Sequence, residues 1–182
     1  MKTRNQIFCV LGGISLVLIF LGSCSKKSAP NDVLHVDKNF KFPPGFPPDP
    51  GNAGKRTLEG IDSDHDGLRD DVQRWIYARY PNDERKRKAL RQMAISIQED
   101  LNPNLKDEDL ETANSREKKA ITCLQEVFDT GTYKFEDYTE LRYLEAKVLN
   151  TAQRTLQSFQ LDGRYDGKVL GPGYPNDGTA CE

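Results

Sequence analysis

A run of aspartates between residues 60 and 71 is the part of the sequence whose residue types and spacing could do chemistry. Residues 62–71 read DSDHDGLRDD, so aspartates stand at alternate positions and a glycine follows the third. Alternating carboxylates converge on one point when a loop curls around a cation, and the glycine gives the backbone the freedom for a sharp turn. Oxygen ligands favour calcium over zinc. The predicted ligands are the carboxylates of Asp62, Asp64, Asp66, Asp70 and Asp71 and the backbone carbonyl of Leu68.

The stretch DSDHDGLRDDV, residues 62–72, resembles the calcium loops of thrombospondin type 3 repeats, dockerins and EF-hands. This resemblance implies a calcium site, and because it covers so little of the chain it implies neither a fold nor an activity. These loops carry a bidentate acid at the twelfth position, where this chain has Gln73. Asp71 or Gln73 could complete the site, with an affinity of about 10⁻⁴ to 10⁻³ M as in extracellular modules. The alternative is a solvated acidic turn that caps the following helix.

The N-terminal 24 residues have the organisation of an export signal. Lys2 and Arg4 precede an apolar run from residue 7 to residue 21, which is short for a membrane-spanning helix. The run ends in LGSC, which resembles the lipobox of bacterial lipoproteins. The resemblance implies that residues 1–23 are a signal peptide, that Cys24 is lipidated, and that Ser25 sorts the protein to the outer membrane, facing the periplasm. The alternative is an uncleaved signal anchor.

Charge gives no reason to expect a nucleic acid as partner. The chain has 26 Lys and Arg and 28 Asp and Glu, and residues 1–23 hold two of the bases and none of the acids. Removal of that segment leaves 24 bases against 28 acids, a net charge of −4. The basic run at residues 83–91 is expected to be a solvated helix face. The expected partners are the membrane, through the lipid on Cys24, and an envelope protein or cell-wall component.

The cysteines fit an oxidising compartment. Cys9 leaves with the signal peptide and Cys24 carries the lipid, so Cys123 and Cys181 remain as a pair. We expect a disulfide bond between them, against the alternative of two free thiols.

Between the lipidation site and the aspartates, residues 24–59 are rich in proline and show no sustained hydrophobic period. The composition predicts a semi-rigid spacer that favours polyproline II, or a ligand for a proline-binding groove. A spacer would leave the aromatic rings of Phe40, Phe42 and Phe46 exposed to solvent. These rings could dock on the domain instead.

The rest of the chain, residues 69–182, predicts an all-α domain. Apolar stripes at helical spacing mark helices over about 69–80, 83–101, 107–129 and 136–161. Short connections favour a small bundle of about four helices, preceded by the calcium loop at 60–71. The Gly-rich tail would be stapled to the third helix through Cys181. No histidine falls within these helices to serve as general base, so we expect a binding or structural module. The alternative is an envelope hydrolase with an acidic active site.

Overall fold

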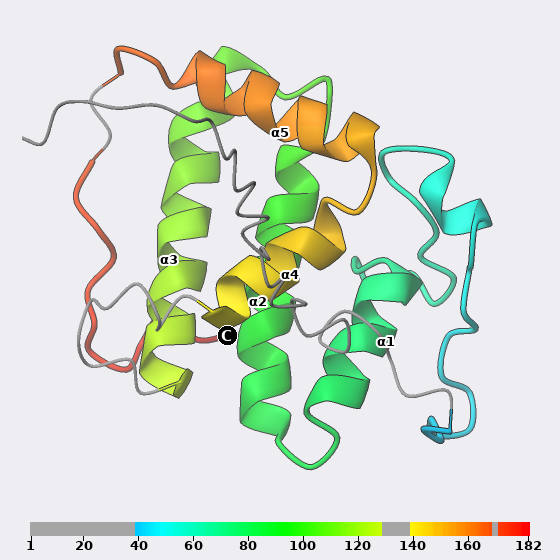
Figure 1. Cartoon of the computed structure of the whole chain (residues 1–182). Coiled ribbons are helices and arrows are strands. Elements are labelled where there is room, and N and C mark those ends of the chain that lie inside the picture. The colour runs from blue at the N-terminus through cyan, green and yellow to red at the C-terminus, as the bar shows by residue number, and fades with distance from the viewer. Residues whose placement is uncertain (1–38, 129–138, 169–170) are drawn as a thin grey trace, which may run out of the picture.

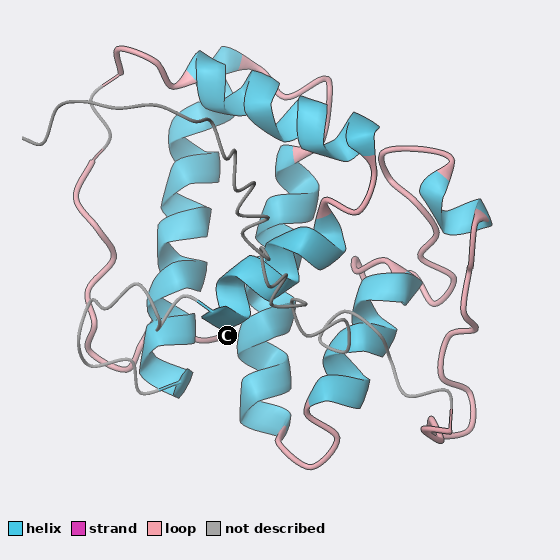
Figure 2. Cartoon of the chain, in the orientation of Figure 1, coloured by secondary structure: helices cyan, strands magenta, loops and turns pink. Residues whose placement is uncertain are grey.

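The computed structural model describes residues 39–128, 139–168 and 171–182, and within these ranges the regular structure is helical, without strands (Figures 1 and 2). The elements are η1 (Ala53–Lys55), α1 (Asp70–Arg79), α2 (Glu84–Asp100), η2 (Asp107–Asp109), α3 (Leu110–Phe128), α4 (Thr139–Val148) and α5 (Ala152–Arg164). The all-α prediction is confirmed. The expected signal peptide, Cys24 and the first part of the predicted spacer lie outside the described residues. Among the helices that the structure describes, none is both long and apolar enough to span a bilayer.

The core forms around α2, which packs against α3, α4 and α1, while α5 lies across one end of the helices (Figure 1). Helices α1 to α4 turn apolar side chains inward, as the spacing predicts, whereas Leu156 and Phe159 of α5 are exposed. Asp83 caps α2 by accepting a hydrogen bond from the backbone N–H of Lys86 at 3.0 Å. The largest buried apolar side chains include Leu68, Val72, Trp75, Leu90, Met93, Leu144 and Val148.

The predicted helix over 136–161 is two helices in the structure, and its first residues lie outside the described ranges. Thr151 has extended backbone angles and caps α5, since its hydroxyl accepts from the backbone N–H of Arg154 at 3.2 Å. An extended residue ends the helical hydrogen-bond pattern although the apolar stripe continues across it. The four-helix prediction is therefore too simple.

A disulfide bond joins Cys123 of α3 to Cys181 of the tail, as the sequence predicts. Cys123 is fully buried, and the neighbouring Ala180 is buried as well. The carbonyl of Ala180 accepts a hydrogen bond from Gln92 Nε2 at 2.9 Å, so the tail also contacts α2. The bond places the C-terminus at the edge of the core.

Residues 39–59, which we call the strap, are packed against the helices, so over this part the spacer prediction does not hold. The rings of Phe40, Phe42 and Phe46 gather around Tyr77 of α1, with centroids 4.8 to 6.2 Å from the tyrosine ring. Arg74 lies 3.8 Å over the Phe42 ring and donates a hydrogen bond to the carbonyl of Pro47 at 2.7 Å. The sequence left this docking open as an alternative; aromatic and cation–π contacts stabilise it.

The C-terminal half of the strap is held by a buried side chain of α5. Arg154 donates to the carbonyls of Gly54 at 2.7 Å, Thr57 at 2.9 Å and Leu58 at 3.0 Å. Gly60 follows with a φ of +71°, and a Cβ there would lie 2.9 Å from Arg154 Nη2. Only glycine suits this close approach and this left-handed backbone. The docked strap therefore fixes the position at which the aspartate loop begins, next to α1.

Candidate metal centre

The aspartate loop curls as its sequence predicts. Asp62 accepts two backbone hydrogen bonds through its carboxylate, from Asp66 N at 3.2 Å and Gly67 N at 2.9 Å. Gly67 has a φ of +86°, the left-handed conformation that the turn requires. These contacts fold the loop back on itself just before α1 begins.

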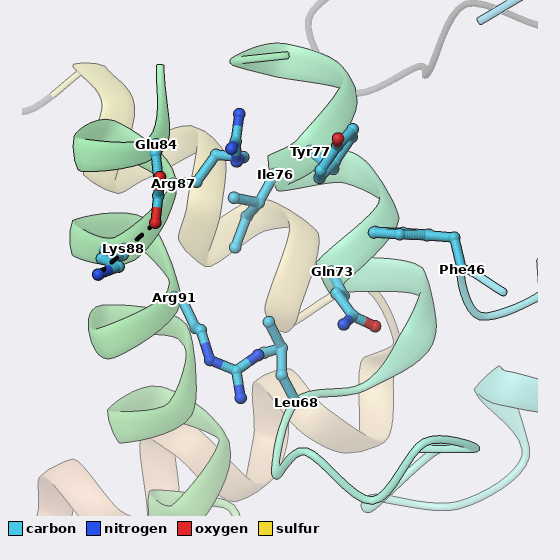
Figure 3. A pocket seen from close by; sticks show the side chains of 9 residues that line it. All are labelled: Phe46, Leu68, Gln73, Ile76, Tyr77, Glu84, Arg87, Lys88 and Arg91. Carbon is cyan, nitrogen blue, oxygen red and sulfur yellow. Dashed lines mark ion pairs between the residues drawn. The ribbon is translucent and has the colours of Figure 1, made fainter. Parts of the chain in front are cut away.

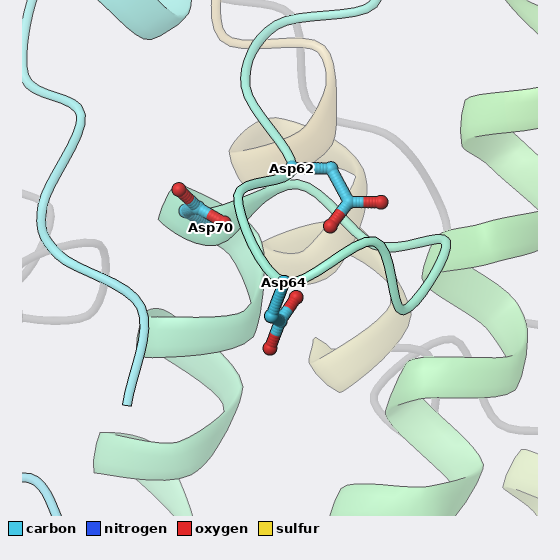
Figure 4. Close-up of side chains that lie close together, drawn as sticks. All are labelled: Asp62, Asp64 and Asp70. Carbon is cyan, nitrogen blue, oxygen red and sulfur yellow. The ribbon is translucent and has the colours of Figure 1, made fainter. Parts of the chain in front are cut away.

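Three of the predicted ligands come together in this loop. Asp62, Asp64 and Asp70 each place one carboxylate oxygen within 4.8 Å of the others, an arrangement that could hold a metal ion (Figure 4). Asp62 and Asp64 come from the loop, and Asp70 is the first residue of α1. The curl of the loop brings Asp62 and Asp64 close to Asp70 although these residues are separated in sequence.

Asp70 is the residue whose environment is hardest to explain without a cation. Its side chain is fully buried, and Oδ1 accepts from the backbone N–H of Ser63 at 2.9 Å. Its Oδ2 is buried and has no hydrogen-bond partner among the described residues. A buried carboxylate oxygen without a partner is costly, and a cation shared with Asp62 and Asp64 would satisfy it.

Asp66 does not join this group. Its Oδ1 accepts from Leu68 N at 2.9 Å, and its Oδ2 contacts Arg91 Nη1 of α2 at 2.5 Å. Gln73 Nε2 also donates to Asp66 Oδ2, at 2.8 Å, and to Asp64 Oδ2 at 3.2 Å. Gln73 thus stands beside the site, at the twelfth position of the loop, and its Oε1 is buried without a partner among the described residues.

Asp71 is turned away from the loop, which corrects its prediction as a ligand. Its carboxylate contacts Arg69 Nε at 2.9 Å, Asn150 Nδ2 at 2.8 Å and Lys147 Nζ at 3.7 Å. Burial alone would raise the pKa of Asp71, but the hydrogen bond and charge of Arg69, with Lys147 and Asn150, hold that pKa below its usual range. The next residue of a helix points about 100° away from Asp70, so both carboxylates cannot face one ion.

Leu68 packs its side chain into the core, as a residue at the seventh position of such a loop should. Its role as a carbonyl ligand stays a prediction.

Two buried arginines that position the loop, Arg69 and Arg154, were not predicted from the sequence. Arg69 donates from Nη1 to the carbonyl of Val148 at 2.9 Å and from Nη2 to that of Lys147 at 3.4 Å, which caps the C-terminus of α4. Arg154 holds the strap, as described above. For Arg69 the only signal is indirect, because it is a base inside an acidic run, and for Arg154 the sequence contains none.

A cavity of about 250 Å³ lies beside the loop, between α1 and α2 (Figure 3). Leu68, Ile76, Tyr77 and Phe46 of the strap form its apolar lining. Its charged lining residues are Glu84, Arg87, Lys88 and Arg91, all from α2. Arg91 and Gln73 line the cavity and also contact Asp66, so the loop and the cavity share residues. Within the basic run, Lys88 is exposed as expected, whereas Arg87 and Arg91 are partly buried.

Comparison with known proteins adds no relative: the chain matches no family model, and neither a curated protein nor a solved structure is similar to it.

Proposed function

We propose that this protein is a lipoprotein of the cell envelope, anchored through Cys24, whose helical domain carries a structural calcium site and serves as a binding or structural module. The observation that carries the calcium assignment is the buried, unpartnered Oδ2 of Asp70 beside the carboxylates of Asp62 and Asp64. The assignment of the anchor rests on the lipobox-like motif LGSC at residues 21–24.

Calcium suits the site because every candidate ligand is an oxygen and because calcium tolerates flexible, incomplete coordination. The ion would join the loop to the first residue of α1 and thereby fix the end of the strap against the helices. At about tenfold above its dissociation constant it would stabilise the fold by about 1.4 kcal/mol. A stabilisation of this size is enough to hold the loop against α1, which is the structural role that we propose for the ion.

The calcium site is tested by thermal unfolding of the full-length protein in detergent, with and without chelator. In the wild type we expect a melting temperature that rises with calcium and saturates in the millimolar range. Asp64→Asn should abolish the rise, because it removes one of the three converging carboxylates at an exposed position and leaves the core intact.

Asp166→Asn is the matched control, since Asp166 is an exposed aspartate that follows α5. It should leave the response to calcium unchanged. An equal response in wild type and Asp64→Asn would show that these carboxylates only cap α1.

The anchor is tested by replacing Cys24 with serine, which keeps the size of the side chain and removes the thiol that receives the lipid. Wild-type protein should incorporate a labelled fatty acid and sediment with membranes. Cys24→Ser should incorporate no labelled fatty acid and should not be cleaved before residue 24. Cys9→Ser is the control within the expected signal peptide, and it should be processed normally. Labelling of Cys24→Ser would contradict the assignment.

A further inference from the structure

We propose that the cavity between α1 and α2 binds a small carboxylate with an apolar body, and that Arg91 makes this binding depend on the ion in the aspartate loop. This inference rests on the proposed calcium site and deepens it, because it gives the ion an effect on a neighbouring ligand.

The cavity has the size and lining of a small-molecule site. An apolar cavity of about 150 Å³ can hold benzene, and this one measures about 250 Å³, which leaves room for a ring and a carboxylate. Aromatic side chains from two segments, Tyr77 of α1 and Phe46 of the strap, stand 4.8 Å apart between ring centroids at its edge. Leu68 and Ile76 complete the apolar part.

The charged part of the lining favours an anion. Three cations, Arg87, Lys88 and Arg91, face one acid, Glu84, which lies 3.6 Å from Lys88 Nζ in an exposed ion pair. The side chains of Arg87 and Arg91 reach from α2 toward Ile76 and Leu68 (Figure 3). Arg87 is held in place by two hydrogen bonds from Nη1, to the carbonyls of Tyr80 and Pro81, both at 2.7 Å. A guanidinium has further N–H donors for a carboxylate, which it binds in a bidentate manner.

Arg91 connects this cavity to the aspartate loop. Its Nη1 lies 2.5 Å from Asp66 Oδ2, and its Nη2 donates to the backbone carbonyl of Asp66. Asp66 occupies the fifth position of the loop, which supplies a ligand in loops of this pattern. In the structure its carboxylate pairs with Arg91 and stays apart from Asp62, Asp64 and Asp70.

Arg91 and an ion in the loop would therefore compete for the carboxylate of Asp66. Coordination of the ion by Asp66 would withdraw the partner of Arg91 and leave a guanidinium charge beside the apolar lining of the cavity. A ligand carboxylate could then replace Asp66 on Arg91. Ion and ligand would favour one another, and linkage requires each to raise the affinity of the other by the same factor.

The test uses the full-length protein in detergent, with calcium and benzoate as probes and benzamide as the neutral analogue, at constant ionic strength. Benzoate binding is followed by ligand-observed NMR and calcium binding by calorimetry. In the wild type, saturating calcium should raise the affinity for benzoate by about five-fold or more, and benzoate should raise the affinity for calcium by the same factor. Benzamide should show no such dependence.

Arg91→Gln removes the competitor, so it should tighten calcium binding by about five-fold or more and abolish the coupling to benzoate. Lys88→Gln is the matched control, because it removes one positive charge from the same helix and the same cavity lining without touching Asp66. It should leave the calcium affinity nearly unchanged and keep the coupling. Asp66→Asn tests the pair from the other side: it should weaken calcium binding and raise the affinity for benzoate without calcium.

Calcium binding that is unchanged or weaker in Arg91→Gln would overturn the inference, and so would benzoate binding that ignores calcium in the wild type. In both cases normal calcium binding by the wild type would leave the proposed metal site intact. A wild type that binds no calcium would overturn the proposed metal site and this inference together.

Discussion

Replacement of Arg154 by alanine is expected to lower the free energy of unfolding by about 3 to 5 kcal/mol and to release the strap from the helices. Arg154 is fully buried and donates to the carbonyls of Gly54, Thr57 and Leu58. It also donates to Asn150 Oδ1 at 2.5 Å. Its removal leaves these buried acceptors without their donor, and each unpaired group costs about 1 to 3 kcal/mol.

Chemical denaturation gives the change in stability, and limited proteolysis with trypsin reports the strap, which contains Lys41, Lys55 and Arg56. In the absence of denaturant, trypsin should cut Arg154→Ala at these sites, whereas the wild type should resist cleavage there. The matched control on the same helix is Arg164→Ala, which removes a surface ion pair with Asp107, in which Arg164 Nη2 and Asp107 Oδ1 are 2.7 Å apart. It should change the stability little, because surface ion pairs are worth little, and leave the strap protected. Equal protease resistance in Arg154→Ala would show that the aromatic contacts around Tyr77 hold the strap by themselves.

Loss of the Cys123–Cys181 disulfide is expected to lower the free energy of unfolding by about 4 kcal/mol. The bond closes a loop with a sequence separation of 58 residues, and its removal increases the entropy of the unfolded chain. The double variant Cys123→Ala, Cys181→Ala should also free the tail, because Ala180 and its contact with Gln92 depend on that anchor.

Denaturation with and without reductant separates this effect from a packing defect at Cys123, which is buried in α3. Reduced wild type and the oxidised double variant should unfold at nearly the same denaturant concentration, and reductant should leave the variant unchanged. A difference below about 1 kcal/mol between oxidised and reduced wild type would contradict the expected role of the bond.

These two effects act on segments toward opposite ends of the chain and on different helices. The disulfide ties the tail to α3, and Arg154 ties the strap to α5. The aspartate loop lies between the strap and α1, so its geometry depends on the strap being docked. We therefore expect the response to calcium to be weaker in Arg154→Ala than in the disulfide variant.

What the sequence determined by itself is local. Asp62, Gly67 and Asp70 are close in the chain, and the turn that brings them together needs only a glycine at a positive φ and backbone N–H donors from the same loop. Helices α1 to α3 begin and end close to where their apolar stripes and Asp83 predict. The prediction of the disulfide followed from counting the cysteines that remain once Cys9 is assigned to the expected signal peptide and Cys24 to the expected lipid.

Only the tertiary structure decided which aspartates come together. Asp71 is taken by Asn150 and Lys147, and Asp66 is paired with Arg91; these partners lie 25 to 79 residues away in the chain. The docking of the strap depends likewise on Arg154, 96 to 100 residues from the carbonyls that it binds. Charged side chains choose partners by proximity in the folded state, and spacing along the chain carries no information about neighbours that are brought together by packing.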